Sequence, residues 1–371
     1  MACNDIKKRI VCLTGILLMS VNLTAIAISD NTRTDPLNDG PYIRKVNKYF
    51  KINWIENGTL REDFLHPGNF KEISRIFNLH FDYDDLKETF SVRANYKKSY
   101  GRADSISVIS DIHGEYGSYI NLLRAGGIID DENKWNFGTG HLVILGDISG
   151  KGEMVTEVFW HLFGLEKQAV IAGGQVHVLL GNHELMLLGN NSDYLNDKYL
   201  KVETLLNTRY HDLYSEQTVL GKWLRSRPVV ITINNKLFVH GGISFEAAGK
   251  KLTVNRINRT FANKIIGKDL QSVYSDEDLK FLCRADGPLW YRGYFEDPDF
   301  CENKLQYILN FFDKERIIVG HTPCLEIDFA FNNRIIGVDT GLQFRQPGEM
   351  LFISDGSFYR ITGTGSRIRI F

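Results

Sequence analysis

The sequence predicts an α/β protein built around a buried sheet, and three observations carry that prediction. Short apolar strands alternate with amphipathic helical segments, several strands end in a polar residue beside glycine, and the composition is that of a globular chain. The 371 residues are 43% apolar and 24% charged, which excludes disordered, collagen-like and multi-pass membrane proteins. The 44 basic and 45 acidic residues give a net charge of −1. A chain with this balanced charge lacks the excess of basic residues typical of nucleic-acid-binding proteins, so we expect no nucleic-acid partner.

At the N-terminus, the sequence predicts a signal peptide over residues 1–27. A basic cluster, Lys7 to Arg9, precedes an uncharged run that ends in Ala25-Ile26-Ala27. Basic start, apolar core and small-residue exit are the three parts of a secretory signal. We therefore expect export to the periplasm or the medium and no stable membrane insertion after cleavage. The alternative is a membrane anchor, since a run of about 17 residues approaches the lower limit for spanning a bilayer.

Residues 28–104 are predicted to be an N-terminal extension with a short hairpin. Phe50 to Trp54 alternate with the period of a strand, and Asn57-Gly58 is a typical turn. The main domain is expected over residues 105–371.

Within the main domain, strands at 106–109, 141–145 and 176–180 alternate with helical segments at 119–125 and 153–165. Apolar strands that alternate with amphipathic helices indicate βαβ units around a buried sheet. Hairpins are expected at 229–239, 327–338 and 350–361, each with a polar turn. Residues 184–227 have helical spacing and are predicted to cap the sheet.

Five strands each end in a residue of metal-ligand type beside glycine. The motifs are Asp111-x-His113-Gly114, Gly146-Asp147, Gly181-Asn182-His183-Glu184, His240-Gly241-Gly242 and Gly320-His321. Taken singly each is weak, because Asp147 could cap the next helix and Asn182 could form a turn. Taken together they point to one crevice, since the carboxyl ends of sheet strands converge there. Carboxylate, imidazole and amide oxygen from five loops suit a pair of divalent ions.

These motifs resemble those of the calcineurin-like metallophosphoesterases, and within them the phosphoprotein phosphatase branch, especially the Shewanella-like protein phosphatases. The resemblance covers about residues 105–345. It implies a four-layer αββα sandwich with a helical cap, in which 105–371 form the catalytic domain. It also implies a dinuclear centre of Mn, Fe or Zn.

The resemblance assigns roles to individual residues. Asp111, His113 and Asp147 are expected to hold one ion, and Asp147 to bridge to a second ion held by Asn182, His240 and His321. Two such ions would activate water and clamp a phosphate. His183, next to Asn182, is expected to give a proton to the leaving group, with a structural hydrogen bond as the alternative role.

One motif departs from the family pattern. The branch has Gly-Asp-x-x-Asp-Arg-Gly, whereas this chain has Gly146-Asp147-Ile148-Ser149-Gly150-Lys151-Gly152. Gly150 stands where the family has the Asp that orients the catalytic His, and Lys151 stands where it has a phosphate-binding Arg. Lysine supplies charge without a two-pronged contact. Lys151 and Arg292 are expected to bind the phosphate, the alternative for Arg292 being a surface residue stacked on aromatic rings.

The sequence thus predicts an exported metal-dependent phosphomonoesterase that acts on phosphorylated protein or on a small phosphomonoester. A diadenosine-polyphosphate or nucleotide hydrolase is the first alternative. The second is a non-catalytic phosphate-binding or scaffold protein, against which the complete set of six ligands argues.

Overall fold

The computed structural model describes residues 36–91, 98–191 and 193–371, and Leu37–Phe371 form one compact unit. The predicted signal peptide lies outside the described residues. Across the described ranges, no helix combines the length and apolar character needed to cross a membrane.

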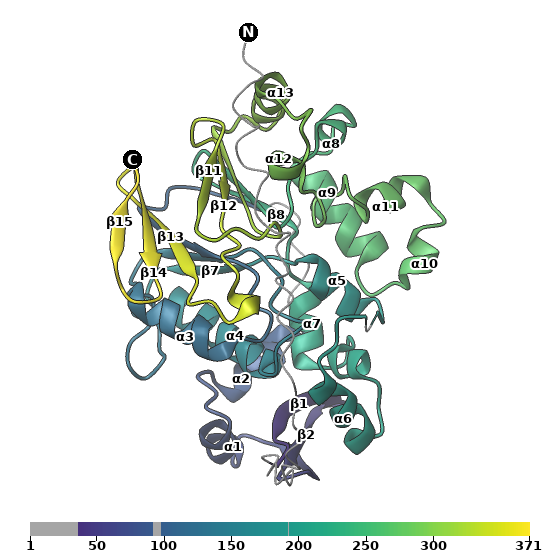
Figure 1. Ribbon diagram of the computed structural model, residues 1–371. Helices are drawn as coiled ribbons and strands as arrows, with labels where there is room; N and C mark the ends of the chain where they lie inside the picture. Colours follow the sequence, from purple (N-terminus) through teal and green to yellow (C-terminus); the bar gives the residue numbers. More distant parts are fainter. Residues whose placement is uncertain (1–35, 92–97, 192) are drawn as a thin grey trace, which may run out of the picture. The chain divides into compact units, whose positions relative to one another are not determined.

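Two six-stranded sheets form the centre of this unit (Figure 1). The first has β5, β6 and β7 running parallel, with an antiparallel extension from β13. Its order is β15 (Arg367–Arg369), β14 (Ser357–Thr362), β13 (Glu349–Ser354), β5 (Ser105–Ile109), β6 (His141–Ile144) and β7 (Gln175–Val178). The second sheet has order β11 (Asp328–Ala330), β12 (Ile335–Gly337), β10 (Arg316–Val319), β9 (Lys236–Val239), β8 (Val230–Ile233) and β4 (Ser99–Tyr100). All three hairpins predicted for the main domain are present as antiparallel pairs.

The two sheets pack face to face through an apolar layer of their own. It includes Val108, Val143 and Leu351 from the first sheet and Ile231, Phe238 and Ile318 from the second, all fully buried. These residues alternate with others that face the helices, as expected for strands with two buried faces.

Helices cover the outer faces of the sandwich. On the first sheet, α3 (Tyr116–Ala125) contacts β14 and α4 (Val155–Ile171) contacts β7, while α9 (Val254–Thr260) contacts β8 of the second sheet. The predicted four-layer αββα architecture is therefore confirmed. Further helices of the described chain are α8 (Phe245–Gly249), α10 (Leu270–Val273), α11 (Glu277–Leu282), α12 (Gly293–Glu296) and α13 (Glu302–Phe312), with the short helical turns η3 (Phe261–Ile265) and η4 (Leu342–Phe344).

The helical segment expected at 184–227 consists of α5 (Asn182–Leu188), α6 (Asp197–Leu206), η2 (Tyr210–Tyr214) and α7 (Val219–Arg225). Asn196 caps α6, and its side chain also donates a hydrogen bond of 2.7 Å to the carbonyl of Lys151. This segment therefore contacts the loop that follows β6.

The N-terminal part of the unit is a small antiparallel sheet of β1 (Asp39–Val46), β2 (Tyr49–Glu56) and β3 (Thr59–Leu65). Two short helices follow, α1 (Phe70–Ile76) and α2 (Tyr83–Thr89). Strand β1 contacts α4 and α7, and Trp160 of α4 donates a 2.8 Å hydrogen bond to the carbonyl of Pro41. The division of the chain at residue 104 stays a prediction.

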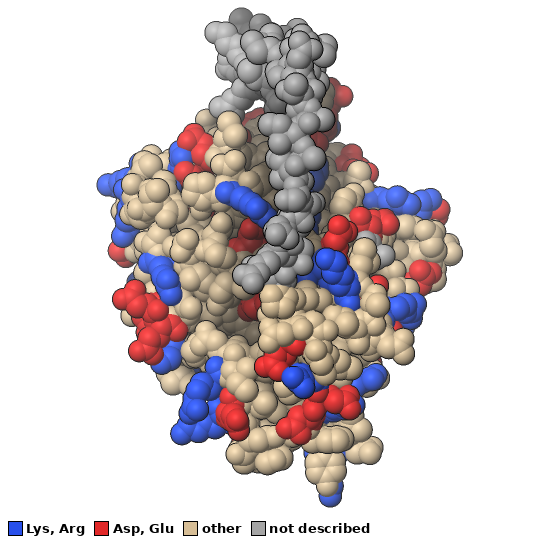
Figure 2. Space-filling model, turned by 60° about the horizontal axis from the view of Figure 1, so that its bottom comes forward, with Lys and Arg blue, Asp and Glu red and all other residues tan. Residues whose placement is uncertain are grey.

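Charged side chains are mixed on the surface shown in Figure 2. Lys and Arg alternate with Asp and Glu over that face and do not gather by sign. Charge on this face therefore does not mark a binding site for a charged substrate.

Candidate metal centre

Six residues expected to be metal ligands lie together at the strand ends, with His183 beside them. Asp111 and His113 follow β5, Asp147 follows β6, Asn182 and His183 begin α5 after β7, His240 follows β9 and His321 follows β10. Each is at most 9% exposed. The convergence of parallel strand ends on one crevice brings them there.

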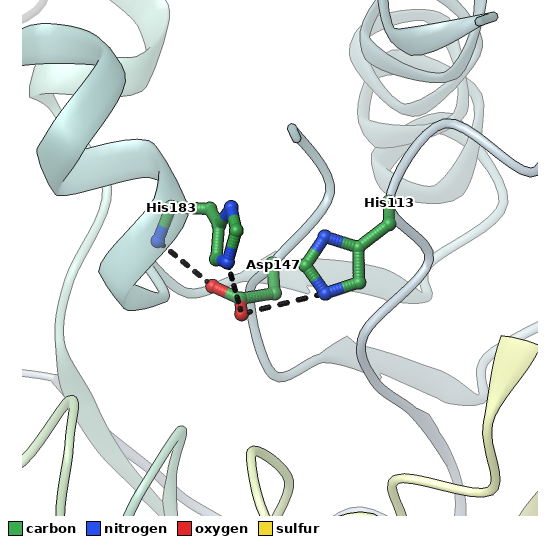
Figure 3. Close-up of side chains that lie close together, drawn as sticks. All are labelled: His113, Asp147 and His183. Atoms are coloured by element: carbon green, nitrogen blue, oxygen red, sulfur yellow. Dashed lines mark hydrogen bonds and ion pairs between the residues drawn. The ribbon is translucent and has the colours of Figure 1, made fainter. Parts of the chain in front are cut away.

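The Asp147 carboxylate lies between two groups of donor atoms. On one side, His113 Nε2 is 3.6 Å from Asp147 Oδ2 and 4.0 Å from Asp111 Oδ1. Figure 3 shows this carboxylate between the imidazoles of His113 and His183, with His183 Nε2 at 3.8 Å.

The second group faces the other oxygen of the same carboxylate. His240 Nε2 lies 3.4 Å from Asp147 Oδ1, 3.0 Å from Asn182 Oδ1 and 3.2 Å from His321 Nδ1. Two clusters suited to a metal ion result, one of His113, Asp147 and His183 and one of Asp147, His240 and His321. Asp147 belongs to both.

Four of these residues have a left-handed backbone conformation. Their φ angles are 54° for Asp111, 47° for His113, 52° for Asp147 and 64° for His321. Residues other than glycine rarely adopt this region, and such strain collects at functional sites. The loops therefore bend in a costly way that turns these four side chains inward.

Hydrogen bonds to carbonyl groups orient two of the imidazoles. His113 Nδ1 lies 2.8 Å from the carbonyl of Ser149, and His240 Nδ1 lies 2.9 Å from that of Leu145. A carbonyl only accepts, so each Nδ1 carries the proton and Nε2 faces Asp147. This is the arrangement that metal-binding histidines use.

Glu184 holds the loop that carries Asp147. Its buried carboxylate accepts backbone hydrogen bonds of 2.8 Å from Asp147, Ile148, Ser149 and Gly181, and one of 2.9 Å from the Ser149 hydroxyl. The sequence motif contains Glu184, yet spacing alone did not indicate this role.

The electrostatics of the centre favour bound cations. Burial lowers the pKa of His113 to about 3 and that of His321 to about 2, so both are neutral donors at pH 7. Burial also opposes charge on His240, but Asp147 and Asp111 outweigh it and raise its pKa to about 9. The pKa of Asp147 lies well below its usual value, since the neighbouring histidines outweigh its burial. Buried carboxylates, the neutral imidazoles of His113 and His321 and an amide oxygen fit divalent transition ions, and an ion bound at His240 would replace its extra proton.

The environment of His183 differs from the family pattern at Gly150. A Cβ atom at Gly150 would lie 2.6 Å from His183 Nδ1 and 2.9 Å from His113 Nδ1, and its φ is 115°. The backbone therefore occupies the space that a side chain here would need. The carboxylate beside His183 is Asp147, whose Oδ1 also accepts the His183 backbone N–H at 3.0 Å.

A cleft of about 680 Å³ opens over the centre. Lys151 and Arg292 line it, as expected, and so does Arg284, which sequence reasoning missed. Four aromatic side chains also line the cleft: Tyr194, Tyr274, Trp290 and Phe344.

The three cations are held in different ways. Lys151 hydrogen-bonds to Gln343 and lies 5.9 Å from the Phe344 ring centre. Arg292 donates to the carbonyl of His321, and Arg284 stacks on Tyr274 at 4.1 Å. All three remain available to an anion because none forms a close ion pair with another described residue; the nearest carboxylate contact is Arg292 to Glu296 at 4.0 Å.

A smaller pocket of about 240 Å³ adjoins the cleft. It is lined by Gly150, His183 and Tyr194 together with residues of the cap such as Leu195 and Tyr210. His183, Met186 and Tyr194 border both spaces.

The fold and the site define a metal-dependent phosphoesterase. A family profile described as calcineurin-like phosphoesterase matches residues 105–325, and the chain belongs to this family. Shewanella-like protein phosphatase 1 of Plasmodium berghei is 28% identical over 302 residues, which cover 79% of this chain and 80% of that protein. Human serine/threonine-protein phosphatase 5 is 27% identical over 160 residues, 42% of this chain and 28% of that protein.

A solved structure is also similar. The cold-active protein-tyrosine phosphatase of a psychrophilic Shewanella species superposes with a TM-score of 0.81 at 32% identity, covering 90% of this chain and 99% of that one. The predicted resemblance to the Shewanella-like phosphatases is confirmed, and the chain is a phosphatase of the metallophosphoesterase class.

Proposed function

We propose that this protein removes phosphate from phosphorylated protein side chains with the help of two divalent ions, Mn, Fe or Zn. The observation that carries the proposal is the Asp147 carboxylate, which faces a donor group on each side at the floor of a cleft lined by three cations. Asp111, His113 and Asp147 would hold one ion, and Asp147, Asn182, His240 and His321 the other. When bound, the ions would supply Lewis acidity toward water and phosphate.

The chain's own residues then bind and orient the substrate. Lys151, Arg284 and Arg292 attract the phosphate, and Lys151 acts as a point charge because it lacks a two-pronged contact. His183 borders both the cleft and the side pocket, so its imidazole can give a proton to the departing oxygen.

Phosphotyrosine is the substrate that the cleft suits best. Tyr194, Tyr274, Trp290 and Phe344 offer ring faces and edges to an aryl group. The similar Shewanella enzyme is named a tyrosine phosphatase, whereas phosphatase 5 is named for serine and threonine. A nucleotide hydrolase remains the competing function, and the comparisons favour a protein phosphatase.

Turnover of para-nitrophenyl phosphate with added Mn²⁺, and again after chelation, tests the metal-dependent reaction. We expect activity that chelation abolishes and Mn²⁺ restores. Activity that survives chelation would overturn the dinuclear mechanism. A panel of phosphotyrosine, phosphoserine and phosphothreonine peptides beside diadenosine tetraphosphate then ranks kcat/KM, with the phosphotyrosine peptide expected first.

We further propose that the chain is exported and acts in the periplasm or the medium. The basic start, apolar run and Ala25-Ile26-Ala27 exit support this proposal. Sequencing of the mature N-terminus tests it, with a start near Ile28 expected. An intact N-terminus in the membrane fraction would favour the anchor instead.

A further inference from the structure

A second cavity lies away from the metal centre, between the N-terminal sheet and helices α3 and α4. Its volume is about 540 Å³, and its lining includes Trp54 of β2, Tyr116 of α3, and Glu157 and Trp160 of α4. None of its lining residues belongs to the catalytic cleft. It is therefore a separate space, and the proposed phosphatase reaction does not use it.

The charge inside this cavity is negative. Asp39, Glu56 and Glu157 line it, and its lining residues include no Lys or Arg. His161 also lines it, but burial lowers its pKa to about 4, so it is neutral at pH 7. The cavity wall thus brings carboxylates and no permanent cation.

The negative charges of two of the three carboxylates are paired with cations that do not line the cavity. Asp39 pairs with Lys198 of α6 at 2.8 Å, and Glu56 pairs with Arg61 at 3.0 Å. Glu157 Oε1 is 3.9 Å from the same Lys198 ammonium. One ammonium therefore faces two carboxyl groups and lies much closer to Asp39, so Glu157 has no close cation among the described residues.

Glu157 is therefore the carboxyl group whose charge a bound cation would match. Its Oε2 is buried and has no hydrogen-bond partner among the described residues. A buried carboxylate oxygen without a partner is costly, so a cation that reaches the Glu157 carboxylate from the cavity would lower that cost.

Aromatic rings form much of the remaining wall. Trp54, Phe77, Tyr116 and Trp160 line the cavity, and Trp54 meets Phe77 edge to face at 5.8 Å between ring centres. Rings around a carboxylate recognise organic cations, because the ring faces attract positive charge while the carboxylate pairs with it.

We propose that this cavity binds a small organic cation, an aryl- or alkylammonium, with its ammonium on Glu157 and its apolar part against the ring wall. The binding site is independent of the phosphatase reaction. The ligand class follows from the wall, since a neutral ligand would leave the Glu157 carboxylate without a cation and an anion would meet three carboxylates.

Calorimetry at pH 8 with phenethylammonium and its neutral analogue 2-phenylethanol tests the proposal on the intact protein. We expect one phenethylammonium per chain and binding at least about tenfold weaker for the alcohol. Glu157→Gln keeps the shape and removes the charge, so it should weaken ammonium binding by about tenfold or more. Glu56→Gln is the matched control, because Arg61 already neutralises that carboxylate, and it should change the affinity less than about twofold.

A second variant separates binding from folding. Trp54→Leu removes one ring and keeps Glu157, so it should weaken binding by about threefold to tenfold, with an unchanged circular dichroism spectrum. Equal affinity for the alcohol, full affinity in Glu157→Gln, or no binding of phenethylammonium at about 10 mM would each overturn the proposal. Displacement of the bound ammonium by millimolar Ca²⁺ would also overturn it, by identifying an inorganic cation site.

Discussion

Asp147 joins the two donor groups, so its charge matters more than that of any other residue in the centre. Its Oδ2 faces His113 and its Oδ1 faces His240. Asp147→Asn keeps the size but removes the negative charge that both groups share. We expect turnover of para-nitrophenyl phosphate to fall by about 10³-fold or more. Asp355→Asn, in the exposed turn after β13, is the control and should retain full activity. Substantial turnover in Asp147→Asn would mean that the two groups do not share a carboxylate.

Gly150 is the residue at which restoring the family pattern should fail. An added Cβ would lie 2.6 Å from His183 Nδ1, and a φ of 115° disfavours any side chain. We therefore expect Gly150→Asp to lower kcat by about tenfold or more through displacement of the imidazoles. Gly101→Asp is the control, since nothing lies within 4 Å of its added Cβ. A rise in kcat for Gly150→Asp would show that the loop relaxes to accept the carboxylate.

Lys151 is the other departure, and here the family residue should help. Lys151 lines the cleft and hydrogen-bonds to Gln343, so its charge already reaches the phosphate-binding space. Lys151→Arg adds a second donor toward the phosphate, and we expect KM to fall by the equivalent of about 1–2 kcal/mol. Steady-state kinetics measure the KM of Lys151→Arg, with Lys87→Arg as the control. An unchanged KM would assign phosphate binding to Arg284 and Arg292.

At the scale of elements, the sequence predicts the buried strands that end in metal-ligand residues. Strands β5, β6 and β7 occur where the apolar runs placed them, and the loops after them carry Asp111, Asp147 and Asn182. Strand β4 has only two residues and could not be recognised from the sequence. It pairs with β8, where Ser99 lies opposite Thr232, 133 positions further along the chain, and no local pattern marks that pairing. The role of Glu184 was equally hidden, because its partners are backbone groups of a distant loop.

The hydrogen bonds from the loop after β6 to Glu184 predict that α5 stabilises this loop through a single side chain. Glu184→Gln replaces two accepting oxygens with one and points an amide NH₂ group at backbone donors. We expect a loss of about 2–4 kcal/mol in the free energy of unfolding and weaker Mn²⁺ activation. Urea unfolding and Mn²⁺ titration measure the two effects, with the exposed Glu277→Gln as control. Normal stability in Glu184→Gln would mean that the loop is held by its ligands alone.

At the scale of the whole molecule, the least predictable feature is the packing of the N-terminal sheet into the same compact unit as the sandwich. The alternation at residues 50–54 predicts a hairpin, but the contacts that join the N-terminal sheet to α6 and α4 are made by single residue pairs. Asp39 with Lys198 and Pro41 with Trp160 are such contacts. Pairs so far apart in the chain leave no periodic signal.

Glu157, within this junction, should make the stability of the whole molecule depend on pH. Burial raises its pKa from 4.5 to about 7, with Asp39 adding to the rise and Lys198 opposing it. The folded state therefore holds a proton that the unfolded state releases between these values, and stability falls as the pH rises through that window. The difference in unfolding free energy between the parent and Glu157→Gln should drop by about 2 kcal/mol from pH 5 to pH 8. Comparison with the variant cancels the effects of the buried histidines. A difference that stays constant with pH would mean that Glu157 is ionised throughout.

The missing side chain at Gly150 also has a consequence for inhibitor selectivity. Gly150 lines the pocket of about 240 Å³ beside His183, and a related phosphatase with aspartate there would present a carboxylate at that position. A phosphonate held over the metal centre and extended past Tyr194 would reach this pocket only where the position is glycine. The sequence change that alters the setting of His183 thus also marks a place where a small molecule can distinguish this phosphatase from those that keep the aspartate.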